Sequence, residues 1–475
     1  MLFALILIPL AAAVAILLGA PARKTALGAA LANILAAAYP LVSFTCPCWN
    51  TGFQVLENPN INLSLGFYSG ASAVMLLLSV LITLAAVYSG KCPEGREKLW
   101  YSSTLLIATG AIGAFLSTDL FFFYAFHEMA LIPTFLMIGI LGRGERKAAA
   151  WKITIYLAFG SIVLLAGLLI ATSHLGSFAF ADMKPDLIPA DVQNTVALLF
   201  IIGFGTLISL FPLHSWAAPA YASAPAPVAM LHAGVLKKFG LYGLLVIGMK
   251  IAPLGMAHWL PLLCVLLLGN IIWVGLVTIN QKRLDLMLGN SSVMHMGYIF
   301  LAIAALAANG HNDIAEPAAI LLMFAHGISI ALLFSLSSAI EEKTGTLEIS
   351  QLGGLAKTAP ALAFIFGLAG MASIGLPGLA NFSGEIMIFL AGFADWKAGT
   401  PLGIVQRTTI VALWGVVISA VYMLRAYRNT FQGPLVKSTD SATDLTLCEK
   451  IPAYMLGAVL LIVGIYPAII LNFLK

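Results

Sequence analysis

The chain has 475 residues, of which 61% are hydrophobic and only 9% are charged, and its formal net charge is +4. So few charges cannot cover the surface of a soluble domain of this size, so the composition excludes a soluble globular protein and indicates a membrane protein. No basic run with interleaved aromatic residues argues for nucleic-acid binding. Five cysteines are too few and too scattered for a disulfide framework, and Cys46 and Cys48 are taken as ordinary loop residues.

Apolar segments long enough to cross a bilayer follow one another along almost the whole chain. A spanning helix needs about 20 apolar residues. Fourteen segments meet this requirement, with expected cores at 2–20, 26–45, 68–89, 101–117, 120–141, 152–172, 195–211, 228–249, 259–280, 290–308, 317–340, 361–392, 403–424 and 451–473. No segment reads as a convincing strand. We therefore predict an all-α polytopic membrane protein with about 14 transmembrane helices, of which the twelfth is long and interrupted.

The distribution of positive charge predicts the orientation in the membrane. The first apolar segment is expected to be a retained helix and not a signal peptide, because Arg23 and Lys24 follow its core instead of preceding it. With the N-terminus outside and the spans alternating, seventeen lysines and arginines fall on the inside and five on the outside. With Lys237 and Lys238, which lie within a span, these are the 24 basic residues of the chain. Because cytoplasmic loops are rich in Lys and Arg, both termini are predicted to face the periplasm.

Two places break the helical pattern. The first is residues 211–216 (FPLHSW), followed by further prolines up to 227, and the second is residues 373–378 (SIGLPG). A proline inside a helix removes a hydrogen bond and clashes with the preceding turn, and such breaks survive in a membrane only where protein or water satisfies the freed backbone. Broken segments at corresponding places in two halves indicate an ion path. The two breaks lie five spans apart, and an odd separation inverts the second unit relative to the first.

Few ionisable residues lie at bilayer depth, where each costs roughly 2.5 kcal/mol or more by insertion scales. They are Glu128, Lys237, Lys238, Glu385 and the histidines His127, His232, His295 and His326. Glu128 lies deep in an apolar helix, so its carboxylate needs a cationic partner or stays protonated. Either state suits a proton relay, while the simpler alternative is a hydrogen bond between helices. Lys152 and Lys238 are the candidate partners of Glu128.

The remaining buried groups are candidates for the same path. Lys237 and Lys238 are adjacent, so they point about 100° apart on a helix and cannot both face one channel. Glu385 follows the second break by a few residues, where unwound backbone and water are expected. Histidine titrates near physiological pH, so His326 and His295 are candidate bridges between distant charged groups. A single membrane histidine is also often only a hydrogen-bonded packing residue.

Four stretches together carry a family resemblance. They are residues 126–133 (FHEMALIP); 212–216 (PLHSW) with 224–227 (APAP) and 233–238 (AGVLKK); 291–297 (SSVMHMG); and 375–378 (GLPG) with 381–385 (NFSGE). In this order and spacing they resemble the proton-pumping membrane subunits of respiratory complex I, which are similar to Mrp-type antiporter subunits. The resemblance extends from about residue 100 to about residue 430.

The resemblance implies a fold with two inverted five-helix repeats, each containing a broken helix. The corresponding divisions of the chain are three N-terminal helices in 1–100, a first antiporter-like repeat in 101–250, a second in 251–425, and a cytoplasmic loop with the last helix in 426–475. Both repeats would place their broken helix beside a proton path.

The resemblance also implies roles for particular residues. Glu128 corresponds to the glutamate of the family's fifth helix, Lys238 to the central lysine of the eighth helix, and Glu385 to the terminal ionisable group of the twelfth. That terminal group is typically glutamate in the M-type subunit and lysine in its L-type and N-type relatives. The chain ends one helix after Arg425, which leaves no room for the long lateral helix of the L-type. The M-type subunit of NADH:quinone oxidoreductase is therefore expected.

An M-type subunit belongs to a larger enzyme and holds no redox centre. The resemblance implies that NADH, FMN, Fe–S clusters and quinone are bound by other subunits, and that this chain binds no cofactor and no metal. Its partners are expected to be the lipid bilayer and the L-type and N-type subunits in a bacterial inner membrane.

One position departs from the family pattern. The family usually has a lysine seven residues before the histidine of the Pro-Leu-His-x-Trp stretch, where this chain has Leu207. Glu128 thus lacks the cationic partner expected from the seventh helix. This departure leaves open the alternative that the chain is a structural subunit whose channel is partly degenerate. A second alternative is an antiporter-like subunit of an Mrp or membrane-hydrogenase complex.

Overall fold

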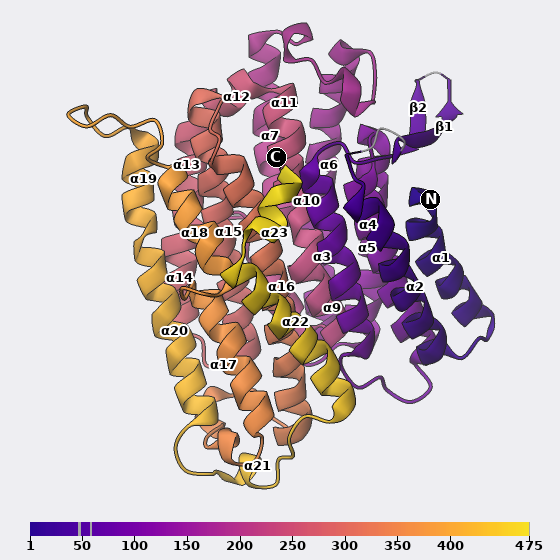
Figure 1. The fold of residues 1–475 in the computed structure, drawn as a ribbon, viewed down its shortest axis with the longest axis vertical. Coiled ribbons are helices and arrows are strands. Elements are labelled where there is room, and N and C mark those ends of the chain that lie inside the picture. Colours follow the sequence, from indigo (N-terminus) through magenta and orange to yellow (C-terminus); the bar gives the residue numbers. More distant parts are fainter. Residues whose placement is uncertain (46–48, 58, 475) are drawn as a thin grey trace.

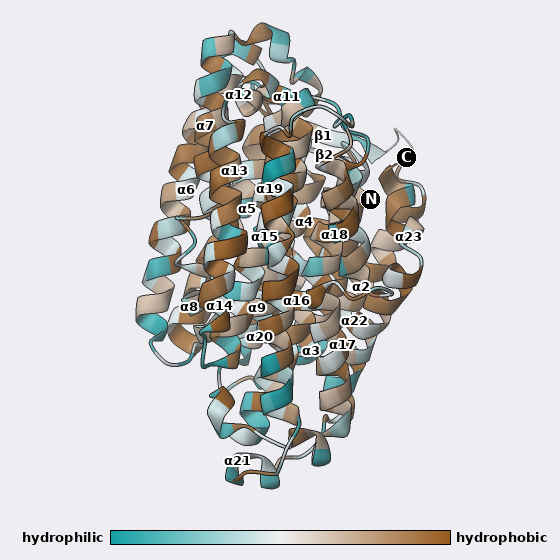
Figure 2. Cartoon of the chain, turned by 90° about the vertical axis from the view of Figure 1, so that its left-hand side faces the viewer, coloured by the Kyte–Doolittle hydropathy of each residue, from teal (hydrophilic) through white to brown (hydrophobic). Residues whose placement is uncertain are grey.

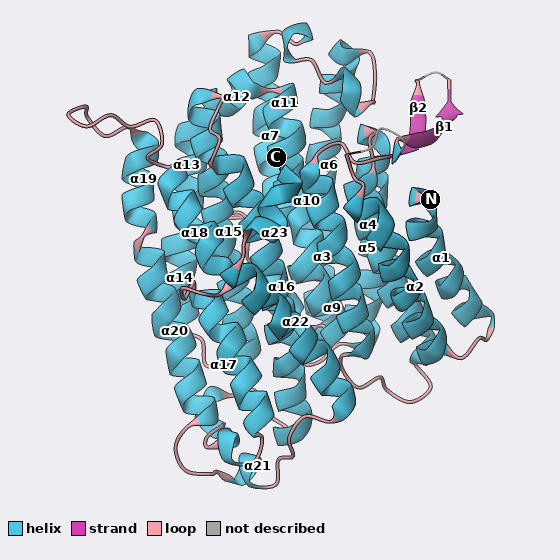
Figure 3. Ribbon diagram, in the orientation of Figure 1, coloured by secondary structure: helices cyan, strands magenta, loops and turns pink. Residues whose placement is uncertain are grey.

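The computed structural model describes residues 1–45, 49–57 and 59–474 and consists of long helices that run side by side (Figures 1 and 3). The helices are α1 (Leu2–Leu18), α2 (Ala22–Val42), α3 (Gly70–Tyr88), α4 (Glu97–Leu116), α5 (Leu120–Leu141), α6 (Arg146–Leu175), α7 (Ala190–Ile208), α8 (Ala217–Ser223), α9 (Ala226–Leu231), α10 (Lys237–Tyr242), α11 (Met249–Ile251), α12 (Pro253–His258), α13 (Leu260–Leu268), α14 (Gly275–Ile279), α15 (Leu284–Asn309), α16 (Ala315–Thr344), α17 (Pro360–Ile374), α18 (Ala380–Ala391), α19 (Ile404–Ala412), α20 (Trp414–Phe431), α21 (Lys437–Asp440), α22 (Leu447–Ile465) and α23 (Ala468–Leu471).

The predicted class, an all-α polytopic membrane protein, is confirmed. Within the described residues, twelve helices are long and apolar enough to cross a bilayer. Two of the expected spans are shorter: the first is α1, and the interrupted twelfth is divided into α17 and α18. The inversion of one repeat relative to the other stays a prediction.

Both predicted breaks are present. The first separates α7 from α8, and residues 209–216 between them form turns. The second separates α17 from α18 around Gly375 and Gly378, whose φ angles of 79° and 89° are left-handed. Glycine adopts this conformation without the Cβ penalty of other residues, so the GLPG stretch ends one half-helix and redirects the chain into the next.

A hairpin of two strands corrects the expectation that no segment forms a strand. Strands β1 (Thr51–Leu56) and β2 (Ile61–Leu65) pair antiparallel at one end of the bundle (Figure 3). A two-stranded hairpin is at best marginally stable alone. Here the backbone beyond β2 joins the turn between α4 and α5, where Gly66 N–H donates to the Leu116 carbonyl at 2.8 Å. The contact comes from a segment about 50 residues away, so local sequence patterns did not reveal it.

Asp119 holds this hairpin to the start of α5. Its carboxylate accepts hydrogen bonds from the N–H groups of Phe121 and Phe122, at 2.9 and 3.2 Å, and from Asn62 N–H of β2 at 3.2 Å. Burial raises the pKa of Asp119 to about 6, although the three N–H groups oppose this shift. Asp119 therefore serves both as the N-cap of α5 and as a link to the hairpin.

We expect Asp119→Ala to lower the free energy of unfolding by about 1 kcal/mol, because the N-cap is lost. Asp119→Asn keeps an acceptor oxygen and removes the buried charge, so its effect is smaller.

Because the folded-state pKa exceeds the ordinary value, the contribution of Asp119 to stability decreases as the pH rises from about 4 to about 6. Thermal unfolding of the purified protein at pH 4.5 and 7 checks this, with the exposed Asp182→Ala as control. This pH dependence is contradicted if the free energy of unfolding of the wild type falls no more than that of Asp119→Asn between pH 4.5 and 7.

The most buried helices lie at the centre of the bundle. The span Ala226–Ile251 consists of α9, α10 and α11 joined by π-helical turns at His232–Leu236 and Gly243–Gly248, and residues 226–248 of it are all buried. The peripheral helices expose large apolar side chains, such as Ile132 and Ile162 at 68% exposure. In Figure 2 the middle of the bundle is predominantly hydrophobic, while hydrophilic residues gather near the two ends. This pattern fits a bilayer around the middle of the bundle.

Candidate functional site: a line of buried ionisable groups

Lys238 lies at the centre of the molecule and is fully buried. Its Nζ donates a 2.8 Å hydrogen bond to the Ala233 carbonyl in the preceding π-helical turn, and it lies 2.9 Å from Nδ1 of His326 on α16. π-Helical turns are frequent at functional sites, and this one includes the carbonyl that orients the lysine. The structure therefore brings together Lys238 and His326, as expected of two groups on one path.

His295 on α15 extends this contact toward the second broken helix. Its ring centre is 5.8 Å from that of His326. Its Nδ1 lies 2.8 Å from the Ser291 carbonyl and its Nε2 lies 2.8 Å from the Ser373 carbonyl at the end of α17. A neutral imidazole has only one N–H, so the doubly protonated ring satisfies both carbonyls and the neutral ring only one. His295 is therefore a candidate proton carrier beside the break.

Glu385 lies on α18, directly beyond the same break, and is 4% exposed. Its Oε1 has no hydrogen-bond partner within the described chain, and its carboxylate lies against the backbone of Gly375. Asn381, one turn earlier on α18, donates to Ser329 Oγ at 3.4 Å and so connects this helix to α16. A buried carboxylate with a free oxygen is a candidate proton acceptor.

Gly375 is required by this arrangement for two reasons. Its φ of 79° strains any residue with a Cβ, and a Cβ there would meet the Glu385 carboxylate. We expect Gly375→Ala to displace Glu385 and to destabilise the break by on the order of 1–2 kcal/mol. The thermal unfolding temperature would therefore decrease. Gly399→Ala is the control, because its φ of 89° is also positive but nothing lies within 4 Å of its added Cβ. Equal unfolding temperatures of the two variants would contradict a structural role for the Gly375–Glu385 contact.

Glu128 lies on α5 and contacts a serine and a histidine. Ser161 on α6 donates a 2.5 Å hydrogen bond to its Oε1, and His127 Nδ1 lies 3.2 Å from the same oxygen. Among the described residues, no lysine or arginine lies within ion-pair distance of it. Sequence reasoning missed Ser161, because a serine inside an apolar helix gives no signal of its partner. The Glu128 side chain is 33% exposed on the outer face of the bundle.

The neighbourhood of Leu207 is apolar and closely packed. A Cβ on Gly160, the residue before Ser161, would meet Thr206 on α7. The next residue along α7 is Leu207, which is 3% exposed and apolar. The two helices thus pack closely beside the serine that contacts Glu128.

Lys152 is placed away from Glu128, at one end of the bundle. It lines a cavity of about 540 Å³ together with Arg143 and Arg283. Arg143 forms an ion pair with Glu341, and Arg283 pairs with Asp285 at 2.7 Å. One turn deeper along α6, Tyr156 accepts a 3.0 Å hydrogen bond from Ser215 in the first break. Lys152 therefore lies beside this cavity and does not form an ion pair with Glu128.

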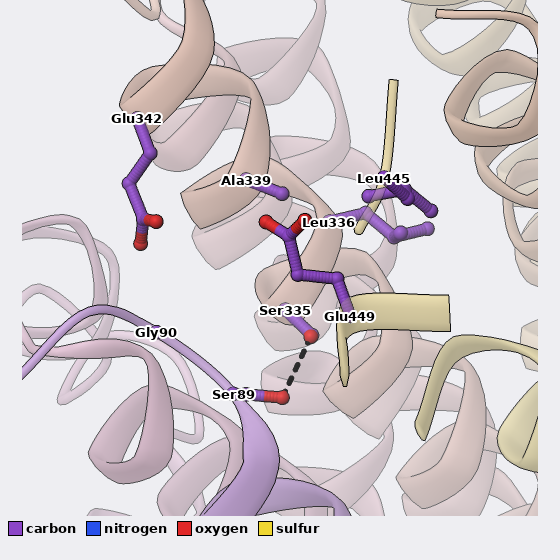
Figure 4. Close-up of a pocket in the computed structure, with 8 residues that line it drawn as sticks. All are labelled: Ser89, Gly90, Ser335, Leu336, Ala339, Glu342, Leu445 and Glu449. Carbon is purple, nitrogen blue, oxygen red and sulfur yellow. Dashed lines mark hydrogen bonds between the residues drawn. The ribbon is translucent and has the colours of Figure 1, made fainter. Parts of the chain in front are cut away.

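A smaller cavity of about 20 Å³ lies where α3, α16 and the start of α22 meet (Figure 4). This is enough space for a water molecule. The Ser89 and Ser335 hydroxyls are 2.8 Å apart in its wall, and Lys343 pairs with Glu449 at 3.1 Å close by. The Lys343–Glu449 pair connects the last long helix, α22, to α16.

Among the described residues, no group of three or more His, Cys, Asp or Glu side chains is arranged to hold a metal ion. Cys46 and Cys48 lie outside the described residues. The site therefore consists of ionisable side chains, hydroxyls and backbone carbonyls.

Comparison with known proteins identifies the family. The model of the transmembrane family "NADH:quinone oxidoreductase/Mrp antiporter, TM" matches residues 117–411, which is more than half of the chain. The chain belongs to this family. It is 34% identical over 432 residues to NAD(P)H-quinone oxidoreductase chain 4 of a Picosynechococcus species, covering 88% of this chain and 79% of the relative. A chain 4 protein of Microcystis aeruginosa is 32% identical, with 93% and 80% covered.

Solved structures agree with this family membership. A chain of respiratory complex I from Thermus thermophilus superposes with a TM-score of 0.88 at 26% identity, covering 100% of this chain and 97% of that one. A chain of the Mrp complex from a Dietzia species has a TM-score of 0.85 at 21% identity, covering 99% and 77%, and shows the shared fold. The predicted resemblance to the complex I membrane subunits, and to the M-type among them, is confirmed.

Proposed function

We propose that this chain is the M-type proton-translocating subunit of a quinone-reducing complex I and that Glu128, Lys238, His326, His295 and Glu385 form its proton path. The observation that carries this proposal is the direct contact between Lys238 and His326, which are buried at the centre of the bundle and form no ion pair with a carboxylate among the described residues. Ionisable groups at this depth are costly and are kept where protons or ions move.

The geometry supports transfer in steps. The ammonium of Lys238 can give a proton to Nδ1 of His326 across 2.9 Å, which leaves a neutral amine and an imidazolium. Two adjacent cations repel each other, so the excess proton is on one group or the other. From His326 the proton passes to His295 and then toward Glu385, whose Oε1 is free to accept it. A water molecule between the rings would complete the step from His326 to His295.

The driving event would lie outside this chain. Quinone reduction in other subunits would change charge or conformation at one end of the path and so alter which group holds the proton. NADH, FMN, Fe–S clusters and quinone would be bound by those other subunits, and the similar Thermus complex I was solved with bound NADH.

The exposed side of Glu128 supports a neighbouring membrane subunit. A carboxylate that is 33% exposed at bilayer depth would face lipid on an isolated chain. Since charged groups at this depth almost always face protein or water, we infer that another antiporter-like subunit, of the L-type or N-type, covers α5. The excess of Lys and Arg at the end that carries α21 supports a cytoplasmic location of that end and a periplasmic location of both termini in a bacterial inner membrane.

Two alternatives are tested together with this proposal. The fold is shared with a chain of the Mrp complex, which leaves an antiporter module possible, and Leu207 favours a structural subunit. An affinity tag on this chain, followed by purification in mild detergent, tests the assembly. We expect the tagged chain to co-purify with quinone-reductase activity and peripheral redox subunits. Co-purification with cation-antiporter subunits only would overturn the complex I assignment. Whether the channel of this subunit moves protons is tested by the variants in the Discussion.

A further inference from the structure

Lys237 is a buried lysine that the proposed path does not use. It is 1% exposed, and its Nζ lies 3.4 Å from Ser292 Oγ and 5.6 Å from the ring centre of Tyr221. No carboxylate among the described residues lies within ion-pair distance of it. Although it is adjacent to Lys238, it points toward α8 and α15, whereas Lys238 points toward α16. Burying a second lysine in the membrane costs free energy, and because Lys237 points away from the Lys238–His326 contact, that contact does not account for it.

Tyr221 connects Lys237 to a histidine. The Tyr221 hydroxyl lies 3.3 Å from Nδ1 of His232, while the face of the same ring lies toward Lys237. His232 is 3% exposed, and its Nε2 has no hydrogen-bond partner within the described chain. Buried polar atoms are rarely left without a partner. In the tautomer that donates from Nδ1 to the tyrosine oxygen, Nε2 presents a free lone pair that can accept a proton.

The group lies toward the Glu128 half of the molecule. His232 and Lys237 contact the same Tyr221 side chain and lie on the central helical span that also carries Phe239. His127 contacts Glu128 and stacks on Phe239 at 4.1 Å between ring centres. Leu207 offers no charge on α7. The buried lysine that shares Tyr221 with His232 therefore comes from the central helix.

We propose that His232, Tyr221 and Lys237 form a second proton-holding group, which serves the Glu128–His127 pair in the absence of a cation on α7. This inference rests on the proposed function, because it adds a branch to the same proton path.

The group exchanges one proton between two positions. With the proton on Lys237, the ammonium is stabilised by the face of the Tyr221 ring and by the Ser292 hydroxyl. With the proton on His232, Lys237 is a neutral amine, Nε2 carries the added proton, and Nδ1–H donates to the Tyr221 oxygen. One positive charge moves and none is created. Both cations contact the same tyrosine and repel each other, so the group holds one excess proton at a time.

The branch also reaches the second half of the chain. Ser292 follows Ser291 on α15, and the Ser291 carbonyl is a partner of His295 Nδ1. Lys237 and Lys238 therefore contact the two adjacent helices, α15 and α16, that carry His295 and His326.

The test uses the intact complex in sealed vesicles, with initial proton uptake measured per quinone reduced. The variants are Lys237→Met, Lys237→Arg and His232→Gln, and assembly is checked on native gels. Lys250→Met is the matched control, since this exposed lysine follows on the same helical span. Arginine keeps a positive charge but does not release its proton. We therefore expect all three test variants, including Lys237→Arg, to lower proton uptake about tenfold or more, while Lys250→Met behaves as wild type.

Each other outcome decides against this inference. If Lys237→Arg pumps as wild type and Lys237→Met does not, Lys237 is a fixed charge and the proton-exchanging role is wrong. If all three pump as wild type while Lys238→Met does not, the proposed path stands and the second branch is wrong. If Lys238→Met also pumps as wild type, both proposals fail. Should Lys237→Met not assemble, His232→Gln decides, because glutamine keeps a hydrogen bond to Tyr221 but cannot take up a proton.

Discussion

Lys238→Met is expected to abolish coupled proton pumping while the complex still assembles. Methionine fills a similar volume, so the packing of the central helix is retained, but it removes the group that donates to His326 and to the Ala233 carbonyl. Removing a positioned proton-transfer group slows the step about 10²-fold or more. The measurement is proton uptake against quinone-reductase turnover in sealed vesicles.

Two comparisons make this result interpretable. Lys250→Met removes an exposed lysine from the end of the same helical span and is expected to leave both rates unchanged. If Lys238→Met pumps and turns over as wild type, the channel does not operate through Lys238. The structural-subunit alternative, which Leu207 favours, then becomes the better account.

Glu385→Gln is expected to have an effect of similar size, for a different reason. The amide keeps the shape of the carboxylate beside Gly375 but cannot accept a proton at Oε1, which has no partner within the described chain. Protons would then reach His295 and go no further, so coupled turnover is expected to fall about 10²-fold. The readout is again proton uptake per quinone reduced.

Glu94→Gln serves as the matched control for Glu385→Gln, because Glu94 is exposed in the loop before α4. Glu385→Asp shortens the side chain but keeps a carboxylate, so it is expected to retain part of the pumping. Full pumping by Glu385→Gln would show that protons leave the path before α18 and would remove Glu385 from it.

The sequence by itself determined the features that depend on local chemistry. Runs of about 20 apolar residues predict spans wherever they occur, because an isolated span must satisfy its own backbone in lipid. Proline and glycine in 211–216 and 373–378 predict the two breaks, because they remove helical hydrogen bonds or permit left-handed backbone. The depth of Glu128, Lys238, His326 and Glu385 identified the candidate path, since charge is costly there whatever its partners.

Only the tertiary structure decided which groups meet. Ser161 as the partner of Glu128, Ser292 as the partner of Lys237 and His326 as the partner of Lys238 depend on how separate helices pack. The start of α17 is a further example: Asp444, about 80 residues later, accepts hydrogen bonds from Ala361 and Leu362 N–H at 3.1 Å. Burial raises the pKa of Asp444, but hydrogen bonds from backbone N–H groups outweigh it, so the pKa lies below its ordinary value. Such contacts join residues far apart in the chain, and local propensity carries no information about them because their energy exists only once the helices are packed.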